Sequence, residues 1–134
     1  MRIGITTGCF DLLHAGHVLY LKEAKENCDK LITCLQTDPT VDRPDTKSFP
    51  VQSMDERRIQ LAAIRYVDGV IEYTTEEELY GILKSVDYSV RFLGDDYQGR
   101  DSWTGSDLDP SVYFVSRDHG WSTTELKERV RKSF

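Results

Sequence analysis

Short apolar runs alternate with longer amphipathic segments along most of this 134-residue chain. Five runs of four to six residues are rich in β-branched and aromatic side chains, which is typical of buried strands. They are Ile3–Thr7, Leu31–Gln36, Val70–Tyr73, Ser89–Leu93 and Val112–Val115. Helical periodicity lies between and after them, and it predicts helices at Val18–Asn27, Met54–Tyr66, Glu76–Lys84 and Thr123–Lys132. Thr75 with Glu78 reads as a capping box that starts the third helix.

Strands that alternate with helices predict right-handed crossover connections and a mostly parallel sheet. The fold class is therefore α/β, a doubly wound five-stranded sheet flanked by helices. We expect one domain over residues 1–134, because the chain has no internal repeat and no composition break.

Two polar segments interrupt the alternation. Thr37–Ser53 carries three of the four prolines, and Asp101–Pro110 is a second irregular stretch. Long connections without helix or strand are usually functional lids or disordered loops. We expect both segments, and the one at about 37–53 in particular, to be mobile without ligand.

Net charge, hydropathy and cysteine usage exclude several classes of function. The net charge of −6 argues against a nucleic-acid partner, because binding to a phosphate backbone needs clustered excess cations. No run of 18 apolar residues exists, and the start of the chain lacks the features of a signal peptide, so no membrane partner is expected. Cys9, Cys28 and Cys34 are odd in number and form no Cys-x-x-Cys pair. This usage fits a reduced, cytoplasmic protein.

Polar clusters directly follow three of the predicted strands. They are Gly8–His17, Gly94–Tyr97 and Arg117–Thr124. Ligands of open parallel sheets bind beyond the carboxyl ends of the strands, where the strand order reverses. We therefore expect these segments, distant in sequence, to form one site.

His14 and His17 lie three residues apart at a predicted helix start. Their imidazole side chains can carry positive charge. Together with the positive end of the helix they can bind a polyphosphate. A metal pair and simple helix capping are the other interpretations, although no third ligand at metal-binding spacing is apparent. Gly16 between the rings would let a phosphate approach the backbone closely.

The cluster after the fifth strand joins Arg117 to three hydroxyls, Ser122, Thr123 and Thr124. Hydroxyls at a helix N-terminus with a nearby arginine form a good anion site, although one of them is also expected to act as the N-cap. The acids Asp95 and Asp96 are less specific, because they could cap a loop, bind a base or ribose, or help hold magnesium.

Three further cations are candidates for a second anionic group: Lys47, Arg57 and Arg65. Arg57 and Arg65 lie eight residues apart on one predicted helix and so close to one face, although each alone could be an ordinary surface arginine. The chain has no P-loop, no Gly-x-Gly-x-x-Gly and no Gly-x-Ser-x-Gly elbow. ATPase, dehydrogenase and serine-hydrolase interpretations therefore lose their usual support.

With the motif GCFDLLHAGH at residues 8–17 and RDHGWSTT at 117–124, the chain resembles the cytidylyltransferase-like nucleotidyltransferases. Within that superfamily it is most similar to glycerol-3-phosphate cytidylyltransferases, also through IRYVD at 64–68 and LGDDYQG at 93–99. The resemblance implies the Rossmann-like HxGH nucleotidyltransferase fold. It also implies transfer of CMP from CTP to a phosphorylated small alcohol, glycerol 3-phosphate first, giving CDP-glycerol and pyrophosphate.

The resemblance also implies residue roles. His14, His17, Arg117, Ser122 and Thr123 would hold the triphosphate and stabilise the charge that develops. The nucleotide would be bound by Gly8, Cys9, Phe10, Gly16, Asp95 and Thr124. The acceptor would be bound by Asp11, Lys47, Arg57 and Arg65. Magnesium would be the cofactor, held mainly by the phosphates with Asp96 as the one candidate side chain. The partner would be a second copy of the chain, with the region of Arg65 near the interface.

Two other hypotheses stay open. Cys9 stands where cytidylyltransferases usually carry threonine, and the Gly-Cys-Phe-Asp form is common in related adenylyltransferases, including the heptose-phosphate type. An adenylyltransferase that acts on a sugar or cofactor phosphate is therefore the second hypothesis. The third is a nucleotide-binding module without catalytic activity.

Overall fold

A computed structural model describes residues 1–134. The elements follow one another as β1 (Ile3–Gly8), α1 (Ala15–Glu26), β2 (Lys30–Gln36), α2 (Met54–Ala62), β3 (Gly69–Tyr73), α3 (Glu76–Ser85), β4 (Val90–Gly94), the 3-10 turn η1 (Asp95–Tyr97), β5 (Val112–Val115) and α4 (Thr123–Lys132). All five predicted strands and all four predicted helices are present.

The strands form one sheet in the order β3-β2-β1-β4-β5, and every neighbouring pair is parallel. The chain moves outward from β1 through β2 to β3, then crosses back to β4 on the other side of β1. The predicted doubly wound α/β fold is therefore confirmed, and the strand order reverses between β1 and β4.

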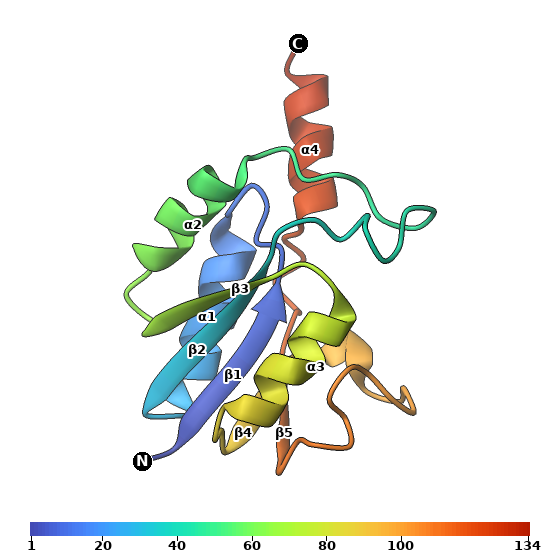
Figure 1. Cartoon of the computed structure of the whole chain (residues 1–134). Coiled ribbons are helices and arrows are strands. Elements are labelled where there is room, and N and C mark those ends of the chain that lie inside the picture. Colours follow the sequence, from blue (N-terminus) through green and yellow to red (C-terminus); the bar gives the residue numbers. More distant parts are fainter.

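Helices cover both faces of the sheet (Figure 1). One core lies between the sheet and the helices α1 and α2; it includes Leu21, Leu61 and Phe92. A second core lies between the sheet and α3 and includes Ile5, Leu79 and Leu83. The helix α4 buries none of its residues and projects from the end of the molecule. No helix is long and apolar enough to cross a bilayer.

Two predicted helices differ in their bounds. The first begins at Ala15 rather than Val18, because the His14 side chain caps it by accepting the Gly16 amide. The second ends at Ala62 rather than Tyr66, because the chain then turns through i→i−3 hydrogen bonds. The prediction that Arg57 and Arg65 share a helix face is therefore wrong.

The cap of α3 is confirmed in part. Thr75 accepts the Glu78 amide at 3.1 Å, as the capping box requires. The Glu78 carboxylate, however, accepts the amide of Thr74 rather than that of Thr75. The reciprocal bond of the box is thus displaced by one residue, while the helix still begins where the sequence predicts.

The Thr37–Ser53 segment contains turns but no helix or strand, and it arches over the carboxyl ends of the strands toward α2 (Figure 1). Contacts hold it at both ends. The Glu76 amide at the start of α3 donates to Asp42 at 2.6 Å, and Asp11 accepts the amides of Val51 and Gln52. Its mobility without ligand stays a prediction.

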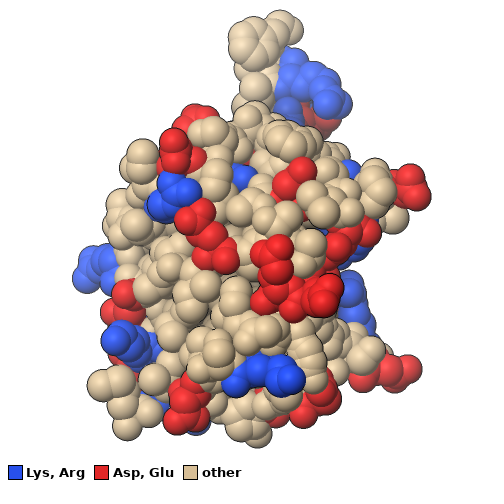
Figure 2. Space-filling view, viewed as in Figure 1, with Lys and Arg blue, Asp and Glu red and all other residues tan.

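Charges are distributed unevenly over the surface. Figure 2 shows acidic side chains gathered near the start of α3, whose first turn carries Glu76, Glu77 and Glu78. Lys and Arg side chains lie on the projecting α4, where the last turn holds Arg129, Arg131 and Lys132. Cations near a helix C-terminus are favoured by the helix dipole, so this basic group has a local explanation.

Candidate active site

Two adjoining pockets open at the carboxyl ends of the strands, beside the point where the strand order reverses. The first pocket has a cavity volume of about 230 Å³ and lies between the β1–α1 turn, η1 and the segment before α4. The second pocket measures about 410 Å³ and lies under the Thr37–Ser53 segment. Both are lined by Thr7, Gly8, Cys9 and Tyr97, so they share a rim.

The β1–α1 turn has an unusual backbone. Phe10 and Leu12 have φ angles of 49° and 50°, a region that residues with side chains seldom adopt. Local contacts hold this conformation: the Phe10 ring is buried, and the Leu12 amide donates to Gln52 at 2.8 Å. Strain of this kind persists only where surrounding contacts fix it, and it clusters at functional sites.

His14 and His17 form a reciprocal cap at the start of α1. His14 Nδ1 accepts the Gly16 amide at 3.0 Å, and His17 Nδ1 accepts the His14 amide at 3.1 Å. Because both Nδ1 atoms are acceptors, each neutral ring carries its proton on Nε2. The His14 Nε2 lies 3.3 Å from the Thr123 hydroxyl. The capping and ligand-binding interpretations are therefore compatible: the Nδ1 edge of each ring caps the helix, and both rings line the pocket, where the Nε2 edge of His14 contacts the Thr123 hydroxyl.

Both rings are neutral at neutral pH in the free protein. Burial, followed by repulsion from His14 and Arg117, lowers the pKa of His17 to about 4. Burial likewise lowers the pKa of His14, with His119 and Arg117 contributing. The sequence suggested rings that carry charge, whereas the structure presents neutral Nε2–H donors. A bound polyanion would favour protonation and raise both values.

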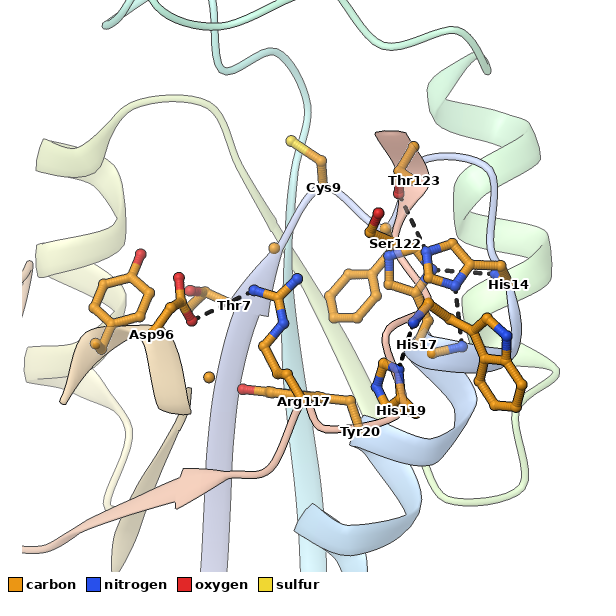
Figure 3. Close-up of a pocket in the computed structure, with 16 residues that line it drawn as sticks. Thr7, Cys9, His14, His17, Tyr20, Asp96, Arg117, His119, Ser122 and Thr123 are labelled. Atoms are coloured by element: carbon orange, nitrogen blue, oxygen red, sulfur yellow. Dashed lines mark hydrogen bonds and ion pairs between the residues drawn. The ribbon is translucent and has the colours of Figure 1, made fainter. Parts of the chain in front are cut away.

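Arg117 lies across the first pocket from the two histidines. Figure 3 shows it pointing toward Asp96 on η1, with Nη1 and Oδ1 3.4 Å apart. Asp95 accepts the Arg117 backbone amide at 3.0 Å and does not line the pocket. Asp95 thus positions Arg117, and Asp96 is the acid that faces the cavity.

Gly16 brings the first and last motifs of the sequence into contact. A Cβ there would lie 2.8 Å from the His14 ring, 2.9 Å from the Trp121 carbonyl oxygen and 3.0 Å from the His119 ring. The space that the sequence suggested for a phosphate is thus occupied in part by the segment before α4. Gly16 lines the pocket and also allows that segment to pack against α1.

The hydroxyls at the start of α4 have separate roles. Ser122 is the N-cap and accepts the Glu125 amide at 3.1 Å, while its side chain also lines the first pocket. Thr123 faces His14, as Figure 3 shows. Thr124 is exposed and lines neither pocket. Of the three hydroxyls predicted to bind the ligand, two therefore lie at the cavity.

The second pocket gathers cations. The turns of the Thr37–Ser53 segment include bonds from the Arg43 amide to the Pro39 carbonyl and from the Lys47 amide to the Arg43 carbonyl. All three residues line the pocket, together with Arg100. Arg43 pairs with Glu76 at 3.3 Å. The predicted acceptor residue Lys47 is thus placed beside the first pocket.

Arg57 and Asp11 have structural partners instead. The Arg57 guanidinium is buried and donates to four backbone carbonyls, those of Cys9, Gln36, Thr37 and Gln52. Asp11 holds the far end of the same segment through two backbone amides. Arg65 is exposed, packs over the Tyr66 ring and lines neither pocket. The structure therefore does not bring these three residues to the acceptor side as the sequence suggested.

Six lining residues of the first pocket had no individual role in the sequence analysis. Thr7 and Tyr20 lie outside the predicted clusters, whereas Gly94, Tyr97, His119 and Trp121 lie inside them. Some had a signal. Tyr20 lies three residues after His17 and hence on the same helix face. Thr7 is the last polar residue of the first strand before the glycine. His119 and Trp121 are stacked, with their ring centroids 5.6 Å apart. Both belong to the motif at residues 117–124, but the sequence analysis assigned no role to either.

No group of three or more His, Cys, Asp or Glu side chains is arranged to hold a metal ion. Asp96 is the one carboxylate that lines the first pocket. One carboxylate beside a triphosphate suits magnesium, which keeps several waters and takes its other ligands from substrate phosphates. A magnesium–triphosphate substrate would therefore fit the donor set of this pocket.

The family model described as cytidylyltransferase-like matches residues 5–129. The chain belongs to the cytidylyltransferase-like family. The matched region contains every lining residue of both pockets. The predicted resemblance to the cytidylyltransferase-like nucleotidyltransferases is confirmed at the level of the family.

Curated relatives of this cytidylyltransferase-like chain include the bifunctional protein HldE of Wolinella succinogenes, 36% identical over 132 residues, which are 98% of this chain and 27% of the relative. The HldE of a Nitratiruptor species is 38% identical over 130 residues, 97% of this chain and 28% of the relative. The chain thus spans little more than a quarter of the length of these proteins.

Solved structures show the same fold. The lipopolysaccharide core biosynthesis protein of Thermoplasma volcanium has a TM-score of 0.62 and 25% identity, covering 98% of this chain and 88% of that one. Pantothenate synthetase of Thermus thermophilus also has a TM-score of 0.62, with 17% identity over 96% of this chain and 64% of that one. The second likeness concerns the fold alone.

Proposed function

We propose that this chain is a nucleotidyltransferase that joins a nucleoside monophosphate, taken from a triphosphate, to a phosphorylated alcohol. The observation that carries the proposal is the arrangement around the first pocket. Two Nε2–H donors from one motif face Arg117 and a hydroxyl from a second motif, with the second, cation-lined pocket alongside. The family membership of the chain supports the same reaction class.

In the proposed reaction an oxygen of the acceptor phosphate attacks the α-phosphorus of the triphosphate. The new P–O bond forms as the bond between the α-phosphorus and its bridging oxygen breaks, and pyrophosphate leaves with that electron pair. The nucleophile is already an anion, so no general base is required. The barrier comes largely from bringing two polyanions together in line, and positioned cations and hydrogen-bond donors lower it.

Each residue has a defined part in this scheme. His14 and His17 donate Nε2–H bonds to the phosphates, while their Nδ1 atoms stay bonded to backbone amides. Arg117 stabilises the α-phosphate region from the opposite wall, and Thr123 adds a hydroxyl. Gly8, Cys9 and Phe10 contact the nucleotide through the strained turn. Magnesium, bound with the triphosphate, would supply further charge neutralisation.

CTP is the first candidate nucleotide, supported by the family description and by the motif resemblance. ATP is the second, supported by Cys9 in place of threonine. Cys9 lies in the rim between the pockets, half-buried and 3.7 Å from the Gln36 side-chain oxygen. Burial raises the pKa of this thiol, which fits a neutral lining group rather than a nucleophile.

The acceptor is a small phosphorylated alcohol. Glycerol 3-phosphate, which gives CDP-glycerol, is one candidate, supported by the motif resemblance. A sugar phosphate is the other, supported by the likeness to a lipopolysaccharide core biosynthesis protein. The homodimer and its interface near Arg65 are further proposals that rest on the resemblance.

Two measurements test this function. Thermal shift with CTP and ATP separately ranks the nucleotides, because a ligand that binds only the native state raises the stability. Pyrophosphate release is then followed with each nucleotide across glycerol 3-phosphate, sugar 1-phosphates and cofactor phosphates. Release that requires both substrates supports the proposal. Nucleotide binding without release for any pair would favour a non-catalytic module instead.

A further inference from the structure

The Asp101–Pro110 segment forms one wall of the second pocket, and a buried cluster fixes it there. Trp103 Nε1 donates to Asp109 at 2.8 Å, and the Tyr88 hydroxyl donates to the same carboxylate at 2.5 Å. The Asp109 side chain is 1% exposed, and Arg91 Nη1 lies 3.6 Å from it. Because one buried carboxylate holds an indole, a phenol and a guanidinium, this wall is preformed rather than loose.

The Trp103 ring is also held from the sides. It packs edge to face against Tyr97 at 6.4 Å and against Phe114 at 6.3 Å. Such perpendicular contacts leave little freedom to rotate the indole. Gly105, at φ 88°, lets the segment pass close to Arg91 and Leu83, where a Cβ would lie 3.1 Å from Arg91 Nη1. The indole, which lines the second pocket, is thus held by two ring contacts and one hydrogen bond.

Arg91 adds buried charge to the floor of this pocket. Its side chain is 3% exposed, and Nη1 donates to the Thr104 carbonyl at 2.9 Å. Its Nε is buried without any hydrogen-bond partner. Asp109 compensates the buried charge of Arg91, so one unsatisfied N–H donor remains, and a hydrogen-bond acceptor on a ligand would satisfy it.

Four cationic side chains line the second pocket, and they are Arg43, Lys47, Arg91 and Arg100. Three of them have carboxylate partners: Glu76 for Arg43, Asp109 for Arg91 and Asp96 for Arg100. Lys47 has no ion-pair partner, so its charge is free for an anionic ligand group. The uncharged lining groups combine aromatic surface with hydrogen-bonding groups: Tyr73, Tyr97, Trp103, Gln36, Ser102 and Thr104. A phosphate together with a hydroxylated carbon skeleton matches that set.

We infer that the second pocket is the acceptor subsite, that it takes a cyclic sugar phosphate, and that Trp103, fixed by Asp109, is its specificity-determining residue. The inference rests on the proposed function, which supplies the nucleotide in the adjoining pocket. The sugar ring packs its C–H face on the indole, and the phosphate lies near Lys47 and Arg100. The cavity of about 410 Å³ is in the range of small-molecule sites, and a three-carbon chain would leave the wall formed by Trp103 largely uncovered.

The chain has two tryptophans, and each pocket contains one. Trp103 lines the second pocket and Trp121 the first. The variants Trp121→Phe and Trp103→Phe therefore keep a single fluorescent reporter in the acceptor and the nucleotide pocket, respectively. Each variant is titrated with glycerol 3-phosphate and with a set of hexose and heptose 1-phosphates, with and without a non-hydrolysable triphosphate.

In Trp121→Phe we expect a sugar 1-phosphate to change the fluorescence at concentrations at least about tenfold below those needed for glycerol 3-phosphate. In Trp103→Phe the triphosphate should give the larger signal. Equal or tighter binding of glycerol 3-phosphate, or no Trp103 signal with any acceptor, would overturn the inference. These titrations do not need turnover, so they separate the subsite from the proposed reaction.

Kinetics give the second readout where the wild-type protein turns over. Trp103→Ala should raise the KM for the sugar phosphate by about tenfold or more and leave kcat within a few fold, whereas Trp103→Phe should keep most of the affinity. Thermal melts show whether each variant is folded. If Trp103→Ala is folded and its KM is unchanged, or if kcat alone falls, Trp103 is no specificity residue.

Discussion

At the level of single residues, the two histidines of the first motif are best understood as neutral hydrogen-bond donors that also cap a helix. Their Nδ1 atoms are occupied by backbone amides, which fixes the direction of both Nε2–H bonds. Because these groups are oriented before any ligand arrives, no reorganisation is needed when charge develops on the phosphates.

Replacing His17 by alanine should lower kcat about a hundredfold or more, which is the usual loss when one positioned transition-state donor is removed. The fold should survive, since α1 keeps its cap from His14. Steady-state pyrophosphate release, with circular dichroism as the check on folding, measures this. A folded variant with near-normal kcat would remove His17 from the proposed mechanism.

His17 should also make the stability of the free protein depend on pH. Its pKa is about 4 when folded and about 6.5 when unfolded, so between these values the unfolded chain binds more protons. Stability is therefore complete above pH 6.5 and is lost as the pH falls toward 4. Between pH 7 and pH 5 the loss from this residue is about 2 kcal/mol.

Urea unfolding at pH 7 and pH 5 measures that loss. His17→Gln should unfold with a smaller difference between the two pH values, while His14, whose pKa is also lowered, accounts for part of what remains. An identical difference in the wild type and the variant would mean that the His17 ring is not neutral in the folded protein.

At the level of elements, the site depends on two segments that pack closely. Gly16→Ala should push the segment before α4 away from α1, because the new Cβ would meet the Trp121 carbonyl at 2.9 Å. We expect weaker binding of the triphosphate and lower activity. Gly81→Ala is the matched control, since nothing lies within 4 Å of its Cβ in α3.

Gly81→Ala should stabilise the protein by about 0.5–1 kcal/mol, as expected in a helix interior. Thermal melts and nucleotide titrations of both variants give the comparison. If Gly16→Ala binds the triphosphate as well as Gly81→Ala does, the packing between the two segments is not required for the site.

The Thr37–Ser53 segment carries Lys47 to the second pocket, so Lys47→Ala should raise the KM for the acceptor about tenfold, in line with the loss of one charge-assisted bond to phosphate. Arg65→Ala is the control, because Arg65 lines neither pocket. The measurement is the KM for the acceptor in each variant. If Arg65→Ala raised this KM as much as Lys47→Ala does, Arg65 would lie at the acceptor, as the resemblance implied.

At the level of the whole molecule, the sequence predicted the elements, the parallel sheet and the convergence of the motifs at one end. It could do so because strand ends and motif residues are local features of the chain. It could not show what Arg57 and Asp11 contact. A charged residue that forms hydrogen bonds with backbone groups cannot be distinguished in the sequence from one that binds a ligand.

For the second pocket the sequence indicated Lys47, but it did not show the wall that faces this residue. Arg91 lies on a buried strand and Trp103 in an irregular segment, and only the tertiary contact through Asp109 brings them together. Periodicity and spacing describe neighbours along the chain, whereas this wall depends on long-range packing. The same holds for the neutral state of His17, which burial imposes.

The central claim is that an acceptor phosphate attacks the α-phosphorus of a nucleoside triphosphate at this site. ³¹P NMR of a reaction with ¹⁸O-labelled acceptor phosphate tests it most directly. The account predicts a new diphosphate diester that contains the label, together with an equal amount of unlabelled pyrophosphate. Labelled pyrophosphate, or release of inorganic phosphate and a nucleoside diphosphate, would contradict it.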